Sequence, residues 1–262
     1  MNEISLTHLL DVAICAAEAA GQHALENKHR RTEAIETFSH DVKLVLDAEC
    51  QKIAEKVIAS EFPDHGILGE EGVRQNRTQA YEWIIDPIDG TMNYTHGFPY
   101  WCCSIAVRHN QKVLAGCVYA PEFEDYYTAH IEESAKLNGE PIKASGTRQL
   151  QDAIIFTGLS KHLEKAAEPQ FEIFRKLALN TQKLRINGAA ALDLCHVAAG
   201  SGDGYFESGI YLWDFAAGGL IAEQAGAVLS LYPQKNEPDA YTVLCANENL
   251  TAGLCAIHTK YI

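Results

Sequence analysis

The stretch Trp83-Ile84-Ile85-Asp86-Pro87-Ile88-Asp89-Gly90-Thr91 is an apolar segment that ends in two carboxylates three residues apart. Pro87 fixes its own backbone angle and supplies no N–H donor, so we expect a strand that turns sharply at this point. Such a turn would let Asp86 and Asp89 face the same point. The pattern therefore predicts a buried strand that delivers a pair of carboxylates to one place.

The residues that follow this pair suit a phosphate group. Gly90 allows a ligand to approach the backbone closely, and Thr91 can open a helix whose first N–H groups attract anions. Carboxylates beside such a site would repel phosphate unless a cation lay between them, and Mg²⁺ prefers carboxylates, waters and phosphate oxygens. The motif therefore predicts a magnesium and phosphate site. The plainer alternative is a strand-to-helix turn that an Asp caps.

Further acidic residues stand on either side of this motif. Glu70 and Glu71 lie between two glycines after a short strand candidate. Asp214 precedes an Ala/Gly-rich helical stretch, and Asp41 and Asp47 surround another helix start. Each has an ordinary explanation, because turns are exposed and helix starts favour acids. Taken together with the first motif, they indicate a shared metal site.

The overall composition is that of an ordinary globular protein with an acidic balance. The chain has 262 residues, of which 47% are hydrophobic and 21% are charged, so it can bury a sizeable core. Lys and Arg number 21 against 35 Asp and Glu, which gives a formal charge of −14. This excess argues against a general binder of nucleic acids or anionic membranes, which would need a basic patch.

The cysteines and the N-terminus predict a cytoplasmic protein. There are eight cysteines and no C-x-x-C pair, and most stand in apolar stretches, where thiols behave as small buried hydrophobes. Residues 1–26 lack the basic start of a secretory signal, and their longest apolar run, Val12–Ala17, is too short for a membrane span. Cys102 and Cys103 lie too deep in a predicted strand for a persuasive nucleophile, although redox activity stays an alternative.

Hydrophobic periodicity predicts interleaved helices and strands. The expected helices are 5–27, 46–62, 164–179, 189–199, 215–225 and 248–258, and Gly226 suits a left-handed helix end. The expected strands are 67–69, 81–85, 101–108, 113–120, 126–130, 153–157, 183–185, 204–206, 227–231 and 242–246. Residues 28–41 are polar, which predicts a mobile loop or lid. The order lacks strict β-α-β regularity, so it favours a layered α/β sandwich over a barrel.

Two long segments resemble the signatures of a known family. Residues 83–99, WIIDPIDGTMNYTHGFP, closely resemble the first signature of the inositol monophosphatase family, and residues 213–226, WDFAAGGLIAEQAG, resemble the second. Gly69-Glu70-Glu71 looks like the family's acidic turn, and the order and spacing match over nearly the whole chain. The resemblance implies an α/β (α+β) fold, the layered αβαβα sandwich of the inositol monophosphatase and fructose-1,6-bisphosphatase type. In one compact unit, residues 1–145 would carry the main metal site and residues 146–262 would complete the active site.

The resemblance also implies a site for two to three Mg²⁺ ions. Glu70, Asp86 and the carbonyl of Ile88 would hold the first ion. Asp86, Asp89 and Asp214 would hold a second. A third, weaker ion would also contact Glu70.

The same resemblance assigns the catalytic groups. Glu70, together with Asp47 paired to Thr91, would orient and deprotonate the attacking water. The amides of Gly90 and Thr91 would face the phosphate. One cation would lower the pKa of the bound water and another would stabilise the leaving alkoxide, so no covalent nucleophile is needed.

On the substrate side, the resemblance implies an alcohol pocket made by Gly188, Ala190 and Glu207. Glu207 would accept hydrogen bonds from substrate hydroxyls, which suits a polyol. Asp89 and Asp214, with the phosphate-facing Gly90 and Thr91 named above, complete the implied substrate-binding set.

The chain also departs from the family pattern. Ser39-His40-Asp41-Val42-Lys43 lacks the Thr that many members carry before the helix acid, and it adds His40 and Lys43. These two residues could form a phosphate-facing lid, or Lys43 could be a solvated charge and His40 a loop residue. Met92 replaces the small or polar residue that often follows Gly-Thr. Both changes leave the substrate open.

The expected function is hydrolysis of inositol monophosphate, or of a similar polyol or sugar phosphate, by a Mg²⁺-dependent phosphomonoesterase. By resemblance it would be sensitive to lithium and a homodimer, with a small phosphate ester as its partner. One alternative is a fructose-1,6-bisphosphatase or a 3′(2′),5′-bisphosphate nucleotidase, although the nucleotidase type typically shows a Leu-Asp-Gly-Thr-Lys signature that is missing here. The non-enzymatic alternative is a regulatory binding protein on the same scaffold, as some bacterial relatives serve transcription complexes.

Overall fold

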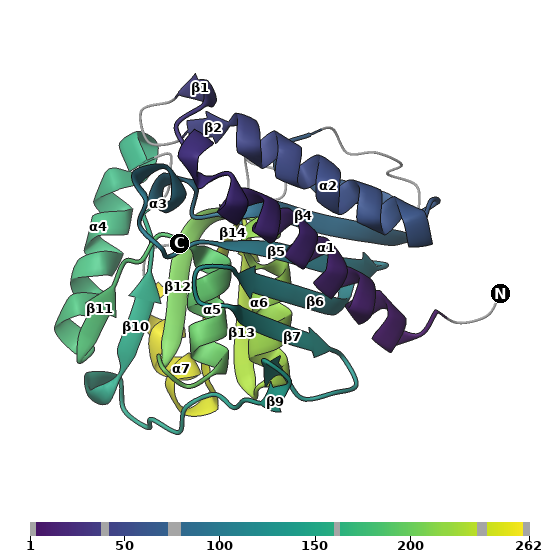
Figure 1. Cartoon of the computed structure of the whole chain (residues 1–262). Helices are drawn as coiled ribbons and strands as arrows, with labels where there is room; N and C mark the ends of the chain where they lie inside the picture. The colour runs from purple at the N-terminus through teal and green to yellow at the C-terminus, as the bar shows by residue number, and fades with distance from the viewer. Residues whose placement is uncertain (1–3, 38–41, 73–79, 160–162, 235–239, 259–262) are drawn as a thin grey trace.

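A computed structural model of the chain (Figure 1) describes residues 4–37, 42–72, 80–159, 163–234 and 240–258. The helical elements are α1 (Leu6–Glu26), η1 (Lys28–Arg30), α2 (Val45–Glu61), α3 (Thr91–His96), η2 (Leu150–Asp152), α4 (Leu163–Asn180), α5 (Ala190–Ala198), α6 (Leu212–Gln224) and α7 (Glu248–His258). The strands are β1 (Ala34–Thr37), β2 (Val42–Leu44), β3 (Gly66–Gly69), β4 (Tyr81–Asp89), β5 (Cys102–His109), β6 (Lys112–Ala120), β7 (Asp125–His130), β8 (Lys136–Leu137), β9 (Glu140–Pro141), β10 (Ile154–Thr157), β11 (Lys183–Arg185), β12 (Gly204–Tyr211), β13 (Ala227–Pro233) and β14 (Ala240–Asn247).

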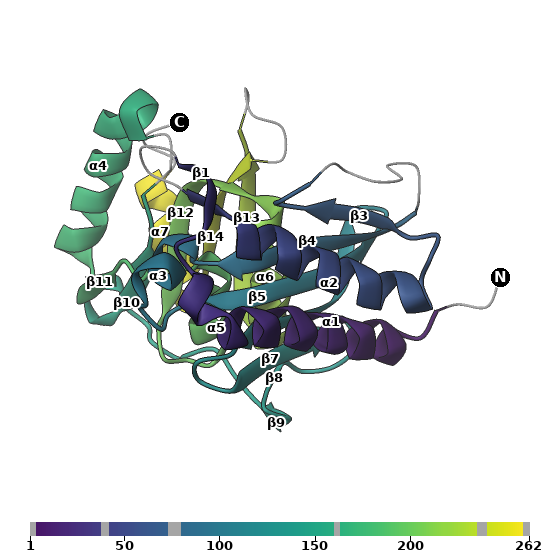
Figure 2. The ribbon, with the colours of Figure 1, turned by 45° about the horizontal axis from the view of Figure 1, so that its top comes forward.

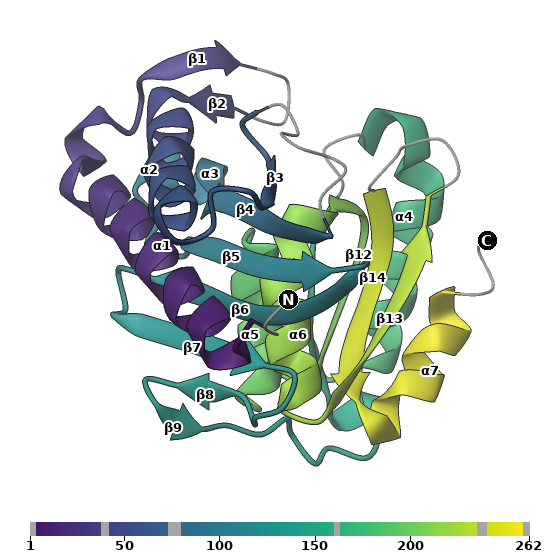
Figure 3. The same ribbon diagram turned by 90° about the vertical axis from the view of Figure 1, so that its right-hand side faces the viewer.

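These elements stack in alternating layers of helices and sheets (Figure 3). Helices α1 and α2 cover one face of the first sheet, and α5 and α6 fill the space between the two sheets. Helices α4 and α7 cover the outer face of the second sheet. The predicted αβαβα sandwich is therefore confirmed. No helix among the described residues is long and apolar enough to span a bilayer.

The two sheets differ in how their strands pair. The first follows the order β3-β4-β5-β6-β7-β8-β9, in which only the β3–β4 pair is parallel. The second follows the order β11-β10-β12-β14-β13, with β10 parallel to both of its neighbours and the other pairs antiparallel. The carboxyl ends of β10, β11 and β12 consequently lie on one edge of this sheet.

Helix α1 packs against the first sheet through a face made mostly of small residues. Leu9, Ala13 and Ala20 are fully buried at helical spacing. A Cβ added at Gly21 would lie 2.7 Å from the ring of Tyr119 in β6, so only glycine fits there. Figure 2 shows α1 and α2 side by side across this sheet.

The predicted sharp turn at Pro87 is wrong. Strand β4 continues through Pro87 to Asp89, and its pairing with β5 shifts register between Asp86 and Asp89. Asp86 pairs with Ser104 and Asp89 with Cys102, so β4 takes three steps where β5 takes two. This extra residue is a β-bulge, a position at which a strand tolerates proline because no ladder N–H is needed.

Two other predicted boundaries also change. The expected loop or lid at 28–41 contains η1 and β1, and β1 pairs with β2 through Glu36 and Lys43. His40 and Asp41 lie outside the described residues. The strand expected over 204–206 runs to Tyr211, because a second bulge at Gly209 (φ 83°) lets β12 continue past a sequence that reads as a turn. Helix α6 therefore begins at Leu212, three residues earlier than expected.

The contact between β6 and α6 gives a first testable prediction. A Cβ at Gly116 would lie 3.1 Å from both Cα and Cβ of Ala217, so Gly116→Val overpacks the junction between the first sheet and the middle helices. We expect a loss of about 1–3 kcal/mol in the free energy of unfolding, measured by urea denaturation. Gly146→Val is the matched control, because a Cβ there meets nothing within 4 Å. Equal stability of the two variants would contradict this packing.

Candidate functional site

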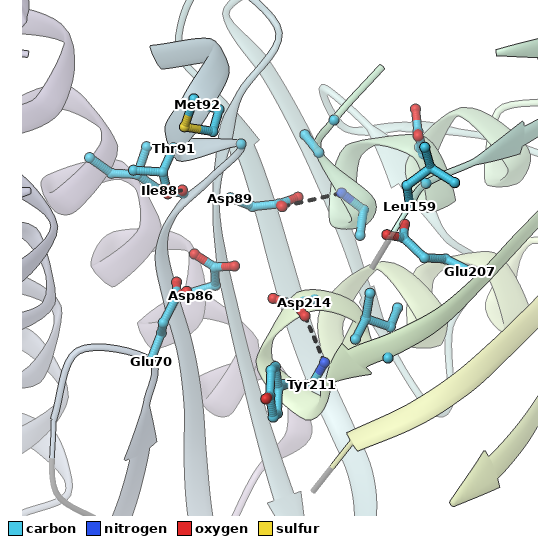
Figure 4. A pocket seen from close by; sticks show the side chains of 18 of the residues that line it. Glu70, Asp86, Ile88, Asp89, Thr91, Met92, Leu159, Glu207, Tyr211 and Asp214 are labelled. Atoms are coloured by element: carbon cyan, nitrogen blue, oxygen red, sulfur yellow. Dashed lines mark hydrogen bonds between the residues drawn. The ribbon is translucent and has the colours of Figure 1, made fainter. Parts of the chain in front are cut away.

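A cavity of about 270 Å³ opens where β4, β12, α5 and α6 meet. It is lined by most of the residues that the sequence singled out, namely Glu70, Asp86, Ile88, Asp89, Gly90, Thr91, Gly188, Ala190, Glu207 and Asp214. Figure 4 shows the carboxylates of Glu70, Asp86, Asp89 and Asp214 directed toward a common space. Asp47 does not line this cavity.

The carboxylate pair at the end of β4 is buried. Asp86 is 1% exposed and Asp89 is 8% exposed. Asp89 accepts hydrogen bonds from the backbone N–H of Ala190 (3.2 Å) and of Ala191 (2.7 Å) at the start of α5. The thiol of Cys102 lies 3.6 Å from the second carboxylate oxygen. The bulge in β4 thus aims Asp89 at the N-terminus of a helix from the second half of the chain.

Burial dominates the electrostatics of Asp89. It raises the pKa of this carboxyl from 3.8 to about 7, while the N–H groups of Ala191 and Ala190 and the Cys102 thiol act in the opposite direction, and the charge of Glu70 adds to the increase. A carboxylate in this position is therefore stabilised by a nearby cation, because a cation favours its charged form.

Asp214 and Asp47 occupy the same place in their respective helices. Asp214 is the third residue of α6 and accepts a hydrogen bond from the N–H of Tyr211 (2.6 Å). Asp47 is the third residue of α2 and accepts one from the N–H of Leu44 (3.1 Å). Each side chain is oriented by the backbone that precedes its helix, which satisfies a donor that helix geometry leaves open.

The segment that the sequence predicts to face phosphate depends on glycine at position 90. Gly90 has φ 91°, and a Cβ there would lie 3.1 Å from the carbonyl oxygens of Gly188 and Tyr100. This left-handed position lets α3 start at Thr91. The Thr91 hydroxyl donates to the Ile88 carbonyl (3.0 Å). The expected pairing of Thr91 with Asp47 stays a prediction.

On the opposite side of the cavity, Glu207 projects from β12. Its Oε2 accepts a hydrogen bond from the hydroxyl of Tyr205 (2.6 Å). A Cβ added at Gly158 would lie 2.2 Å from the Glu207 carboxyl group, so a side chain at position 158 would displace it. Glycine at the end of β10 thus makes room for this carboxylate.

Sequence reasoning missed a buried acid on the same side. Asp193 lines the cavity and is 2% exposed. Its Oδ1 accepts hydrogen bonds from the hydroxyl of Tyr100 (2.5 Å) and the amide of Asn187 (2.7 Å). Burial raises the pKa of Asp193 to about 8, with further increases from the charges of Asp89 and Glu207, while the two donors act in the opposite direction. The sequence did offer a signal for this residue, because Asp193 is the one acid within the apolar stretch 189–199.

Of the two unusual basic residues, Lys43 is described by the structure and His40 is not. Lys43 pairs with the Glu71 carboxylate (2.6 Å), and this hydrogen bond raises its pKa. It does not line the cavity, so its position does not support the alternative of a phosphate-facing lid. His40 lies outside the described residues.

The adjacent cysteines behave as buried apolar side chains. Cys102 and Cys103 are both fully buried. Burial raises the pKa of each thiol well above its ordinary value, so neither forms a thiolate nucleophile readily. The expectation that they take no part as nucleophiles agrees with this environment.

The donor set fits a hard divalent cation. Six carboxylates line the cavity, and none of its described lining residues is Lys, Arg or His. Within the part of the chain that the structure describes, no three His, Cys, Asp or Glu side chains are already gathered as a metal cluster. Oxygen ligands suit Mg²⁺, which keeps several waters and so needs few direct protein ligands. The buried pair Asp86 and Asp89 supplies the negative charge that such an ion would neutralise.

Comparisons with known proteins agree with this arrangement. Residues 5–262 match the sequence model of the inositol monophosphatase family. A protein named Nus factor SuhB from Vibrio cholerae is 38% identical over 226 residues, which is 85% of this chain and 84% of the relative. A protein named inositol monophosphatase from Dictyostelium discoideum is 34% identical over 258 residues, 95% of this chain and 94% of the relative. The solved structure of an inositol monophosphatase from Anabaena superposes with a TM-score of 0.87 at 31% identity, covering 98% of this chain and 97% of the other.

The pKa of Asp89 gives a prediction about pH. Between 3.8 and about 7, the folded metal-free protein holds a proton on Asp89 that the unfolded chain has lost, so raising the pH through this window lowers stability. The loss is on the order of 4 kcal/mol for about three pKa units. Asp193, with a pKa of about 8, contributes with the same sign.

Urea denaturation in EDTA at about pH 5 and about pH 7.5 measures this dependence. We expect Asp89→Asn to flatten the decline in the free energy of unfolding, because the variant has no proton to release there. An equal decline in wild type and variant would rule out Asp89 as its source. Glu140→Gln, which changes an exposed acid that does not line this cavity, is the control.

Proposed function

This chain belongs to the inositol monophosphatase family, and from that premise we propose that it is a Mg²⁺-dependent phosphatase of inositol monophosphate or a similar polyol or sugar phosphate. The observation that carries the proposal is the convergence of Glu70, Asp86, Asp89 and Asp214 on one cavity. These residues come from separate elements, and a phosphate-facing helix start, Thr91, adjoins them. Such a set of carboxylates can hold an anionic substrate only through a cation.

The carboxylates would share two to three Mg²⁺ ions. Glu70, Asp86 and the carbonyl of Ile88 would hold one ion, and Asp86, Asp89 and Asp214 another, while Glu70 would also contact the third. When bound, Mg²⁺ supplies charge neutralisation for phosphate and lowers the pKa of a coordinated water. The buried position of Asp86 and Asp89 supports this assignment, because isolated charges are costly away from water.

The remaining catalytic work would fall to side chains and backbone at the phosphate end. The N–H groups of Gly90 and Thr91 would donate to phosphate oxygens, as free N–H groups at a helix start do. Glu70, assisted by Asp47 and Thr91, would orient the attacking water and accept its proton. The contact of the Thr91 hydroxyl with the Ile88 carbonyl places this residue beside a proposed ligand, which supports the assignment.

The opposite end of the cavity would receive the alcohol. Gly188 and Ala190 would line its floor, and Glu207 would accept hydrogen bonds from hydroxyl groups. Tyr205 supports this role because its hydroxyl holds one oxygen of Glu207 in place. Asp89 would contact both the metal and the substrate, since it lies between the two ends.

The lining favours a monophosphate over a bisphosphate. A second phosphate on the alcohol would need a cationic partner, and none of the described residues that line this cavity is basic. The alcohol side instead carries the carboxylates of Glu207 and Asp193. Fructose-1,6-bisphosphatase and 3′(2′),5′-bisphosphate nucleotidase activities remain alternatives. Phosphate release from a panel of monoesters and bisphosphates, with Mg²⁺ and with EDTA, separates them.

A regulatory binding role is a second candidate function, favoured by the name Nus factor SuhB that the relative from Vibrio cholerae carries. An Asp86→Asn variant distinguishes the two candidates in the native host. If binding is the required function, the variant should replace the wild-type gene without a growth defect. If phosphate hydrolysis is required, it should fail to do so.

Other attributes are proposed from the sequence and the family resemblance. These are a homodimeric state, a cytoplasmic location, inhibition by lithium, and the organisation of residues 1–145 and 146–262 as two halves of one compact unit. Sedimentation of the purified chain tests the first, and phosphate release with added lithium tests the third.

Asp86→Asn should abolish hydrolysis of every ester. The change removes a ligand proposed for two ions, so we expect kcat to fall roughly 10³-fold, corresponding to several kcal/mol of transition-state stabilisation. Mg²⁺ binding, followed by titration calorimetry, should weaken in parallel. Glu223→Gln is the control and should keep both properties. Wild-type hydrolysis by Asp86→Asn would contradict the metal assignment.

Glu207→Gln should act on the alcohol and not on the phosphate. Loss of a charged acceptor for a hydroxyl costs about 1.5 kcal/mol, so KM for inositol 1-phosphate should rise roughly tenfold. KM for p-nitrophenyl phosphate, which has no such hydroxyl, should change little. Glutamine can still accept the hydrogen bond from Tyr205, which keeps the local structure. An equal effect on both esters would show that Glu207 is structural.

A further inference from the structure

The cavity has an apolar rim that a simple polyol does not explain. Met92, Leu159 and Ile186 all line the cavity, and they are 44%, 38% and 50% exposed. Single exposed hydrophobic residues are normal, but a group of them around one cavity usually marks a binding surface. We call these three residues the apolar rim.

Three separate segments supply the apolar rim. Met92 lies in α3, whereas Leu159 follows β10 and Ile186 follows β11. Strands β10 and β11 run parallel, with Phe156 opposite Arg185, so Leu159 and Ile186 leave the same edge of the sheet. The fold therefore brings three segments that are far apart in the sequence to the lining of one cavity.

The apolar rim adjoins the polar groups that would bind the alcohol. In Figure 4, Leu159 lies beside the carboxylate of Glu207, and Met92 lies next to the phosphate-facing Thr91. One oxygen of Glu207 is held by Tyr205, and Oδ1 of Asp193 is held by Tyr100 and Asn187. The alcohol would thus meet both carboxylates and hydrocarbon side chains in this cavity.

We propose that the preferred substrate is a phosphate monoester whose alcohol carries, besides hydroxyls that reach Glu207, an apolar group of aromatic size that packs on Met92, Leu159 and Ile186. This inference rests on the proposed phosphatase function and specifies its substrate class. Continuity of the apolar rim with the catalytic cavity favours the substrate as its occupant. The lack of any basic residue among the described lining also disfavours a second charged group there.

A matched pair of esters tests the inference. Methyl β-D-glucoside 6-phosphate and phenyl β-D-glucoside 6-phosphate share the phosphate, the leaving oxygen and the free hydroxyls, and differ only in the group at the far side of the ring. We expect kcat/KM with Mg²⁺ to be about tenfold higher for the phenyl ester. At about 25 cal/mol per Å², a tenfold preference requires removing only roughly 55 Å² of ring surface from water.

Variants of the apolar rim assign the preference to these residues. Leu159→Ser and Met92→Ser should each lower the phenyl-to-methyl ratio of kcat/KM several-fold, and the variant with all three positions changed to serine should bring it near one. Their exposure means that the fold should tolerate the changes, which circular dichroism verifies. Phe123→Ser is the matched control, because Phe123 is 47% exposed and does not line the cavity.

The possible outcomes separate this inference from the function on which it rests. If wild type hydrolyses both glucoside phosphates equally, the apolar-group inference is overturned while the phosphatase function stands. If it releases phosphate from neither these esters nor inositol 1-phosphate, the phosphatase function itself fails. If the serine variants keep the phenyl preference, or change only the oligomeric state by light scattering, the apolar rim is not a substrate surface.

Discussion

The rest of the site depends on one contact, the hydrogen bonds that the Asp89 carboxylate accepts from the start of α5. It joins the last residue of β4 to the backbone N–H groups of Ala190 and Ala191, about one hundred positions later in the chain. The amide of Asn93 reinforces the same junction by donating to the carbonyls of Tyr100 and Asn187, both at 2.7 Å. A negative group at a helix N-terminus is favourable because the free N–H groups and the helix dipole are positive there. Through this junction, residues of β4 and α5 come to line one cavity.

The proposed function requires an acidic chain to bind an anionic substrate. The chain carries a formal charge of −14, and six of its acidic side chains line one cavity. Burial raises the pKa of Asp89 and of Asp193, so the metal-free site holds protons where the working site would hold cations. Under the proposed function, part of the negative charge would hold divalent ions, and the remainder would favour solubility.

The two ends of the cavity are built by different means. The proposed metal end consists of side chains that the backbone orients directly: Asp86 and Asp89 sit on a bulged strand, and Asp214 accepts from the backbone before its own helix. At the proposed alcohol end, the carboxylates are oriented by hydrogen bonds from other side chains. Tyr205 donates to Glu207, and Tyr100 donates to Asp193. Under the proposed function, a different residue at a loop position such as Leu159 would change which substrate is preferred, while the metal chemistry would stay the same.

The sequence by itself determined the local features of this protein. Asp86, Asp89, Gly90 and Thr91 could be predicted together because they lie close together in one segment. Hydrophobic periodicity located most helices and strands because it reflects each element's own buried face. Only the tertiary structure decided the backbone path at Pro87, where β4 pairs with β5 through a β-bulge in place of the expected sharp turn. It alone brought Asp193 to Tyr100 and Gly158 to Glu207, and it gathered the apolar rim. The physical reason is that these contacts join segments far apart in the chain, and such contacts leave no periodic pattern in the sequence.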